Sequence, residues 1–142
     1  MGRRASRETA MKLLYQLEIQ KEDREDQINR VFEENEVDEN DRQYILDVVN
    51  GVTNNKDHID RVIEKYSKGW KIGRISKVDL SILRLSVYEI SFRDDIPFNV
   101  SINEAVELAK KYSSEEAGAF VNGILGKVPR IKIVTAENPS DT

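Results

Sequence analysis

Three arginines stand close together at the start of the chain, at positions Arg3, Arg4 and Arg7. The planar guanidinium group can donate two hydrogen bonds to one phosphate, so arginine is the side chain best suited to phosphate contact. Tyr15 follows about two helical turns later and adds a ring on which a base can stack. The segment is therefore a candidate for binding single-stranded RNA. The alternative is a solvated basic terminus without a ligand.

A second basic segment surrounds the only tryptophan of the chain. Lys68, Lys71 and Arg74 flank Trp70, and Tyr66 stands just before them. We expect the indole ring to seal the edge of the core. The alternative is an exposed ring that stacks on bases while the flanking cations neutralise phosphates, a combination that suits single-stranded nucleic acid.

The rest of the chain is acidic. Over 142 residues the formal net charge is −4, and acidic residues predominate between the two basic segments and after the second one. Net charge alone argues against a nucleic-acid partner, but its distribution decides the question. If the two basic segments meet in space, the protein has a positively charged face despite a pI of about 5.2.

Catalytic arrangements are poorly represented. The chain has no cysteine and one histidine, His58, which excludes thiol nucleophiles, His–Cys pairs and most zinc sites. No Gly-x-x-x-x-Gly-Lys-Ser/Thr loop is present, and the glycines do not open a dinucleotide-binding unit. We therefore expect a binding protein with no catalytic residues, metal or cofactor. No apolar run is long enough to span a membrane, and we expect a cytoplasmic protein.

The elements that must position these side chains are helices. Apolar residues recur at helical spacing in every long segment, which predicts an all-α fold of about seven helices with no strand. The expected helices cover residues 8–20, a short segment around 28–32, a segment beginning after Asp38 or Asn40 and interrupted at 53–55, its continuation to residue 66, and segments starting at Ser76, Ser101 and Ser113. Residues 1–135 are expected to form one domain, followed by a frayed tail at 136–142.

The helix that begins at Ser76 is the most apolar. Its apolar residues spread around most of the helix, which predicts a central helix covered on several sides. The charged side chains Asp79, Arg84 and Glu89 on this helix then need partners, because a buried charge must be paired.

Two helix starts near the C-terminus show the spacing of a capping box. Ser101 is followed three residues later by Glu104, and Ser113 by Glu116. In a capping box the serine side chain accepts a hydrogen bond from the third residue of the helix, and the glutamate reaches back to the cap. We therefore expect Ser101 and Ser113 to be N-caps.

Three stretches resemble one known family. They are Arg3–Gln16, Val78–Ile90 and the region from Ile102 to Leu125, which includes Asn-Glu-Ala-Val-Glu-Leu-Ala-Lys and Phe-Val-Asn-Gly-Ile-Leu. Over nearly its full length the chain resembles the bacterial NusB family of transcription antitermination factors. The resemblance implies two perpendicular three-helix bundles that share one core. It also implies binding to single-stranded boxA RNA of ribosomal RNA operon leaders together with NusE, a small-subunit ribosomal protein, within an RNA polymerase antitermination complex, and no catalysis.

The resemblance also assigns roles to individual residues. Carried onto matching positions, it places Arg3, Arg4 and Arg7 on RNA phosphates, Tyr15, Tyr66 and Phe120 at the RNA face with Glu116 nearby, and Asp79 at the NusE interface. The expected RNA contact of Lys68 rests on its charge alone. Ala5 stands where some family members carry another arginine, so the arm has less charge here.

Two glycines in the last helix receive different expectations. Gly118 lies beside the positions assigned to RNA, so we expect it to keep the approach of RNA open. Gly123 falls among core positions, so we expect it to permit close helix packing.

Other interpretations of the chain stay open. A helical adaptor that binds only protein would use the basic segments for an acidic partner. A homodimer would cover the RNA face. A related domain also precedes RNA cytosine methyltransferases, but 142 residues leave no room for such an enzyme.

Overall fold

The computed structural model describes residues 1–133, and this part of the chain is helical. The helices are α1 (Arg3–Ile19), α2 (Arg24–Glu34), α3 (Glu39–Asn54), α4 (Lys56–Tyr66), the short 3-10 helix η1 (Ile72–Arg74), α5 (Lys77–Phe92), α6 (Phe98–Tyr112) and α7 (Glu115–Leu125). The prediction of an all-α fold with about seven helices is confirmed. The predicted tail at 136–142 lies outside the described residues.

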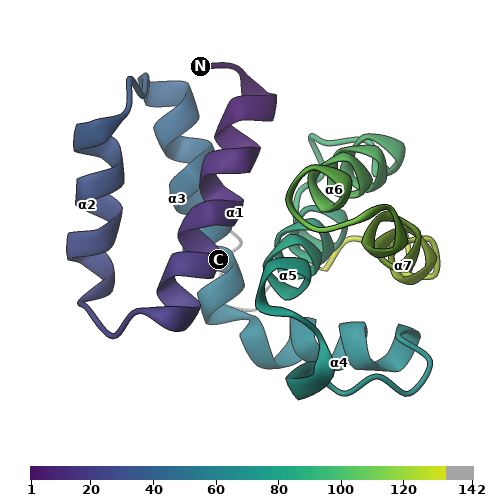
Figure 1. The fold of residues 1–142 in the computed structure, drawn as a ribbon. Coiled ribbons are helices and arrows are strands. Elements are labelled where there is room, and N and C mark those ends of the chain that lie inside the picture. The colour runs from purple at the N-terminus through teal and green to yellow at the C-terminus, as the bar shows by residue number, and fades with distance from the viewer. Residues whose placement is uncertain (134–142) are drawn as a thin grey trace, which may run out of the picture.

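The helices form two groups around α5. Figure 1 shows α1, α2 and α3 lengthwise and side by side, whereas α5, α6 and α7 are seen close to end-on. Helix α5 contacts α1, α3, α4, α6 and α7, and every residue from Leu80 to Ser91 is buried. The prediction of a central helix is therefore confirmed. No helix in residues 1–133 is long and apolar enough to cross a membrane.

Two charged residues of α5, Arg84 and Glu89, are paired as their burial requires. Arg84 donates two hydrogen bonds of 2.8 Å to the carboxylate of Asp60 and one of 3.1 Å to Glu18. Glu89 is 0% exposed and accepts hydrogen bonds from Arg7 of α1 (2.9 Å), Ser101 of α6 (2.7 Å) and Tyr44 of α3. Glu89 thus joins both groups of helices through one carboxylate.

The expected cap at Ser101 is wrong. Helix α6 begins at Phe98, with Pro97 in the N-cap position. Proline suits a helix start, because its fixed φ fits the entry and its missing N–H would have no partner there anyway. Ser101 is instead buried inside α6, where its hydroxyl binds Glu89, and Glu104 binds arginines of α1. The local sequence pattern assigned Ser101 and Glu104 to a helix cap, but in the structure both side chains bind residues of other helices.

Two further expected helix starts, those of α7 and α1, are also displaced. Ser114, not Ser113, caps α7, and its hydroxyl accepts the amide hydrogen of Ala117 at 3.0 Å. Ser113 is the residue that ends α6. Helix α1 begins at Arg3, five residues before the expected start. The N-terminal arginines therefore belong to a helix and not to an extended arm.

The packing of the two glycines of α7 is the reverse of that expected. Gly118 is buried, and a Cβ added to it would lie 3.0 Å from Cγ of Lys110 on α6. Gly123 is exposed, and an added Cβ would meet nothing within 4 Å. Gly118 is therefore the glycine that permits close packing, here against α6. The helical period placed Gly123 near the core, but α7 turns that face toward solvent.

Candidate nucleic-acid interface

Arg7 is the most buried of the N-terminal arginines. Its side chain is 3% exposed, and it donates hydrogen bonds to Glu89 at 2.9 Å and 3.4 Å and to Glu104 at 3.3 Å. Burial alone would lower the pKa of Arg7, but the Glu89 carboxylate outweighs burial and the pKa is raised. The expected phosphate contact of Arg7 does not fit this position, because the guanidinium is enclosed by protein and already paired.

Arg4 and Arg3 are accessible but also have partners within the protein. The Arg4 side chain is 80% exposed and donates two hydrogen bonds to Glu104, at 3.0 Å and 2.8 Å. The guanidinium of Arg3 lies 4.4 Å from the centre of the Tyr44 ring and 4.0 Å from Asp95. An RNA phosphate that reached Arg4 would therefore compete with a carboxylate that already binds it in bidentate fashion.

The second basic segment is a fixed, exposed turn. Lys68 and Gly69 have φ values of 54° and 91°, and these two left-handed residues reverse the chain after α4. The turn is closed by the Ser67 hydroxyl, which donates to the carbonyl of Trp70 at 2.6 Å, and by the Ile72 amide, which donates to Glu64 at 2.9 Å.

The indole of Trp70 is exposed. The residue is 52% exposed, and its ring meets the ring of Phe120 edge-on at 6.0 Å. The expectation that Trp70 seals the core edge is therefore wrong. The turn at Lys68 and Gly69 carries the indole onto the outer surface beside α7.

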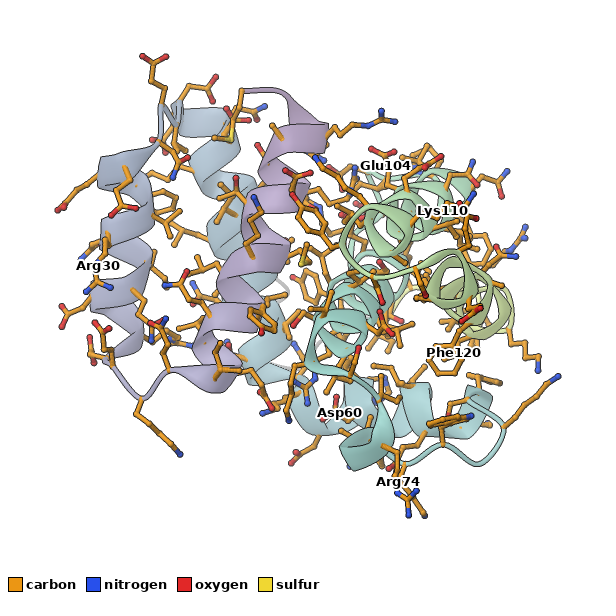
Figure 2. All side chains as sticks on the ribbon, in the orientation of Figure 1. Arg30, Asp60, Arg74, Glu104, Lys110 and Phe120 are labelled. Carbon is orange, nitrogen blue, oxygen red and sulfur yellow. The ribbon has the colours of Figure 1, made fainter. Side chains whose placement is uncertain are left out.

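Phe120 stands between two hollows of the surface. One hollow is lined by residues of the α4 end and α7, and the other by residues of the turn, α5 and the start of α7. Figure 2 shows Phe120 facing the turn, with Arg74 projecting outward below it. We call this region the Phe120 surface; its residues are Tyr66, Lys68, Trp70, Arg74, Asp79, Glu116, Phe120 and Lys127. The structure thus brings together seven of the residues singled out from the sequence.

In residues 1–133, neither the cations of the Phe120 surface nor the neighbouring Lys71 form an ion pair. Within residues 1–133, no carboxylate lies within 4.0 Å of the side-chain nitrogens of Lys68, Lys71, Arg74 or Lys127. Lys65, one turn earlier, lies 5.4 Å from the centre of the Tyr66 ring. Exposed cations beside aromatic rings provide phosphate neutralisation and base stacking together.

Two carboxylates border the same surface. Glu116 is exposed at the start of α7. Oδ1 of Asp79 is buried without a hydrogen-bond partner in the described part of the chain, and Asp79 lines the hollow beside Trp70 and Phe120. A buried unpaired oxygen costs about 1–3 kcal/mol. A donor group on a bound partner would remove that cost.

The part of the chain that the structure describes holds no metal-binding cluster beside these features. Residues 1–133 contain no group of three or more His, Asp or Glu side chains that could hold a metal ion. His58 is half-buried, and its ring meets the ring of Phe92 edge-on at 6.3 Å.

Comparison with known proteins identifies the family. The family model described as "NusB family" matches residues 4–130. The chain belongs to the NusB family. Transcription antitermination protein NusB from Acetivibrio thermocellus is 67% identical over 137 residues, which cover 96% of this chain and 94% of the relative. The NusB protein of Ruminiclostridium cellulolyticum is 65% identical over 130 residues, covering 92% and 90%.

Solved NusB structures share the fold. NusB from T. maritima matches with a TM-score of 0.84 and 37% identity, over 90% of each chain. A chain from the crystal structure of the antitermination factors NusB and NusE in complex with dsRNA matches with a TM-score of 0.80 and 31% identity, over 89% of this chain and 94% of that one. NusB proteins are antitermination factors and not enzymes, so the prediction of a non-enzymatic protein is confirmed.

The residues that the NusB resemblance assigned to RNA are not the same set as the residues that lie at the Phe120 surface. Tyr15 is half-buried on α1 and lines neither hollow beside Phe120. The sequence assigned no RNA contact to Lys127, which lies one turn past Ile124 at the end of α7 and lines the hollow with Tyr66. In the sequence, only the positive charge of Lys127 could have indicated an RNA contact, and many surface lysines carry the same charge. The sequence identified Trp70 and Arg74 as part of a basic segment, but only the structure of the turn shows that they lie beside Phe120.

Proposed function

We propose that this chain is a cytoplasmic transcription antitermination factor that binds single-stranded boxA RNA of ribosomal RNA operon leaders. It does so together with NusE and as part of an RNA polymerase antitermination complex. The observation that carries the proposal is the Phe120 surface, where three aromatic rings lie beside cations that have no carboxylate partner in residues 1–133. Relatives over almost the whole chain are antitermination proteins, and one structural neighbour comes from a complex of NusB, NusE and dsRNA.

In this proposal the residues of the Phe120 surface have different roles. Tyr66 and Phe120 offer ring faces or edges to unpaired bases, and Lys68 neutralises a phosphate beside them. Glu116 is a poor neighbour for phosphate, so it accepts a hydrogen bond from the amino group of a base. Such a contact reads the identity of the base, whereas the lysine contact does not.

The N-terminal arginines play a different part in this proposal. Arg3 and Arg4 reach RNA only by exchanging their contacts with Asp95 and Glu104 for phosphate. Arg7 acts indirectly, because its buried pair with Glu89 holds α1 against α5.

Asp79 is the proposed contact for NusE. Its unpaired Oδ1 lies next to the aromatic hollow, so a partner that donates a hydrogen bond there would dock directly beside the RNA. The same oxygen is the observation that favours the second candidate function, a protein-binding adaptor without RNA. Charge reversal by Asp79→Lys should weaken NusE binding with helicity unchanged by circular dichroism. If helicity and binding fall together, Asp79 is a structural residue.

The test is RNA binding by the full chain with and without NusE, against a scrambled boxA sequence. If about three to five phosphates are neutralised, log K should fall with log salt at a slope of roughly −2 to −3.5. Phe120→Ala should weaken boxA binding, whereas Phe32→Ala on the distant helix α2 serves as the matched control. Binding that is insensitive to salt and to Phe120 would reject the proposal. Binding to NusE alone would select the adaptor, and size-exclusion chromatography of each sample would reveal a homodimer.

A further inference from the structure

The turn from Ser67 to Arg74 holds its tryptophan in a defined place. The amide of Trp70 donates to the Ser67 carbonyl at 3.3 Å, and the Ser67 hydroxyl donates back to the carbonyl of Trp70 at 2.6 Å. On the other side, the Arg74 amide donates to the carbonyl of Lys71 at 2.9 Å and closes η1. A half-exposed indole on a fixed turn loses little conformational freedom when a ligand binds, which favours its use as a binding group.

We propose that Trp70 is a further base-stacking residue for single-stranded RNA, and that Lys71 and Arg74 hold the phosphates next to the stacked base. This inference rests on the proposed function and extends it beyond the positions matched from the family. Because Trp70 meets Phe120 edge-on at 6.0 Å, the two rings form one continuous aromatic site. The RNA-binding surface therefore runs from Phe120 outward along the turn.

Charge selects RNA over a protein as the ligand of the indole. Lys68, Lys71 and Arg74 all lie within the turn, and none has a carboxylate partner in residues 1–133. Asp79 and Glu116 line the hollow next to Trp70, together with Arg74. The two carboxylates repel phosphates, so in this proposal the RNA backbone follows the turn, where Lys71 and Arg74 lie. Figure 2 shows Arg74 extending away from the helices, in a position to meet such a backbone.

The single tryptophan makes the stacking directly observable. Because Trp70 is the only tryptophan in the chain, its fluorescence reports on this site alone. Titration of the full chain with boxA RNA should quench the fluorescence. Trp70→Ala should weaken boxA binding roughly 5- to 150-fold, the range for loss of one stacked base. Trp70→Phe should retain part of the affinity because the ring is kept.

The phosphate contacts have their own test. Lys71→Ala and Arg74→Ala should each make the salt slope less steep by roughly 0.7, the value for one phosphate on a single strand. Lys77→Ala is the matched control, because Lys77 is paired with Glu18 on α1 at 3.2 Å. The salt slope of the Lys77→Ala variant should equal that of the unmodified chain.

The outcomes separate this inference from the proposed function. If Phe120→Ala weakens boxA binding and Trp70→Ala does not, the proposed function stands and the role of Trp70 is refuted. If Trp70→Ala weakens NusE binding alone, a protein covers the indole and the inference is refuted as well. If the unmodified chain binds no boxA RNA, both proposals fall. Circular dichroism of each variant checks that the exposed positions leave the fold unchanged.

Discussion

The two basic segments of this chain have similar compositions and different surroundings. The N-terminal arginines and the turn from Ser67 to Arg74 both place cations near aromatic residues in the sequence. In the structure, Arg3, Arg4 and Arg7 each lie within 4.0 Å of a carboxylate. The cations of the turn have no such partner among residues 1–133. Only the second segment therefore offers positive charge that is free to bind phosphate.

Helix packing accounts for the difference. Helix α1 packs against α5, which brings Glu89 to Arg7 across 82 positions of sequence. Arg4 likewise meets Glu104 of α6 across 100 positions. The turn projects beyond the helices that it connects, and in residues 1–133 no carboxylate comes within 4.0 Å of its side-chain cations. A cluster of charge in a sequence indicates phosphate binding only when the fold leaves the cluster unpaired.

The largest expected effect tests the buried side of this comparison. Arg7→Ala leaves Glu89 buried without its cation, and breaking a buried pair in this way costs about 3–5 kcal/mol of unfolding free energy. Arg4→Ala, which removes an exposed arginine one turn earlier, should cost far less, because solvent screens an exposed ion pair. Urea denaturation of both variants measures the two values. Equal losses would show that the two arginines do not differ in structural role.

A smaller effect tests whether internal pairing restrains the N-terminal arginines. Glu104→Gln removes the carboxylate that binds Arg4 and should raise boxA affinity by up to about fivefold, the equivalent of one exposed ion pair. Glu107→Gln is the matched control, because it changes the net charge equally but forms no ion pair in residues 1–133. An equal gain in both variants would mean that net charge alone is responsible. Salt titrations of the two variants measure the difference.

Alanine substitutions at the two glycines of α7 compare the packed side of this helix with its open side. Gly123→Ala adds a methyl group in open space next to the Phe120 surface and should raise the unfolding free energy by up to about 1 kcal/mol, the helix-propensity difference. Gly118→Ala should gain less, because its methyl group would lie 3.0 Å from Cγ of Lys110. Chemical denaturation ranks the two variants, and a larger gain for Gly118→Ala would contradict the packing described for α7.

The smallest expected effect is a pH dependence of the unfolding free energy at Asp95, which lies beside Arg93 and Arg3. The hydrogen bond from Arg93 lowers the pKa of Asp95, and the charges of Arg93 and Arg3 act in the same direction. A carboxyl with a lowered folded-state pKa stabilises the fold above its unfolded pKa of about 3.9, and this stabilisation is lost as pH falls through the folded value. The stability difference between the unmodified chain and Asp95→Asn should therefore shrink from pH 7 to pH 2.5 in urea denaturation. A constant difference would exclude this titration.

Part of the site was predictable from the sequence because it depends on local pattern. Helical spacing identified the central helix α5 and its need for charge partners, and the family resemblance assigned Tyr66, Glu116 and Phe120, which the structure brings to one surface. The burial of Arg7 was not predictable. Its carboxylate partners come from α5 and α6, and no local pattern indicates which face of α1 will meet them.

The sequence by itself determined an all-helical, non-enzymatic chain of the NusB family, because helical period, composition and family motifs are properties of the order of residues. The tertiary structure alone decided which charges are paired, which serines cap helices and which glycine is packed. Each of these depends on groups that are distant in sequence and become neighbours when helices pack. Ser101 shows the reason most directly: its local spacing favours a cap, but its hydroxyl binds the buried carboxylate of Glu89.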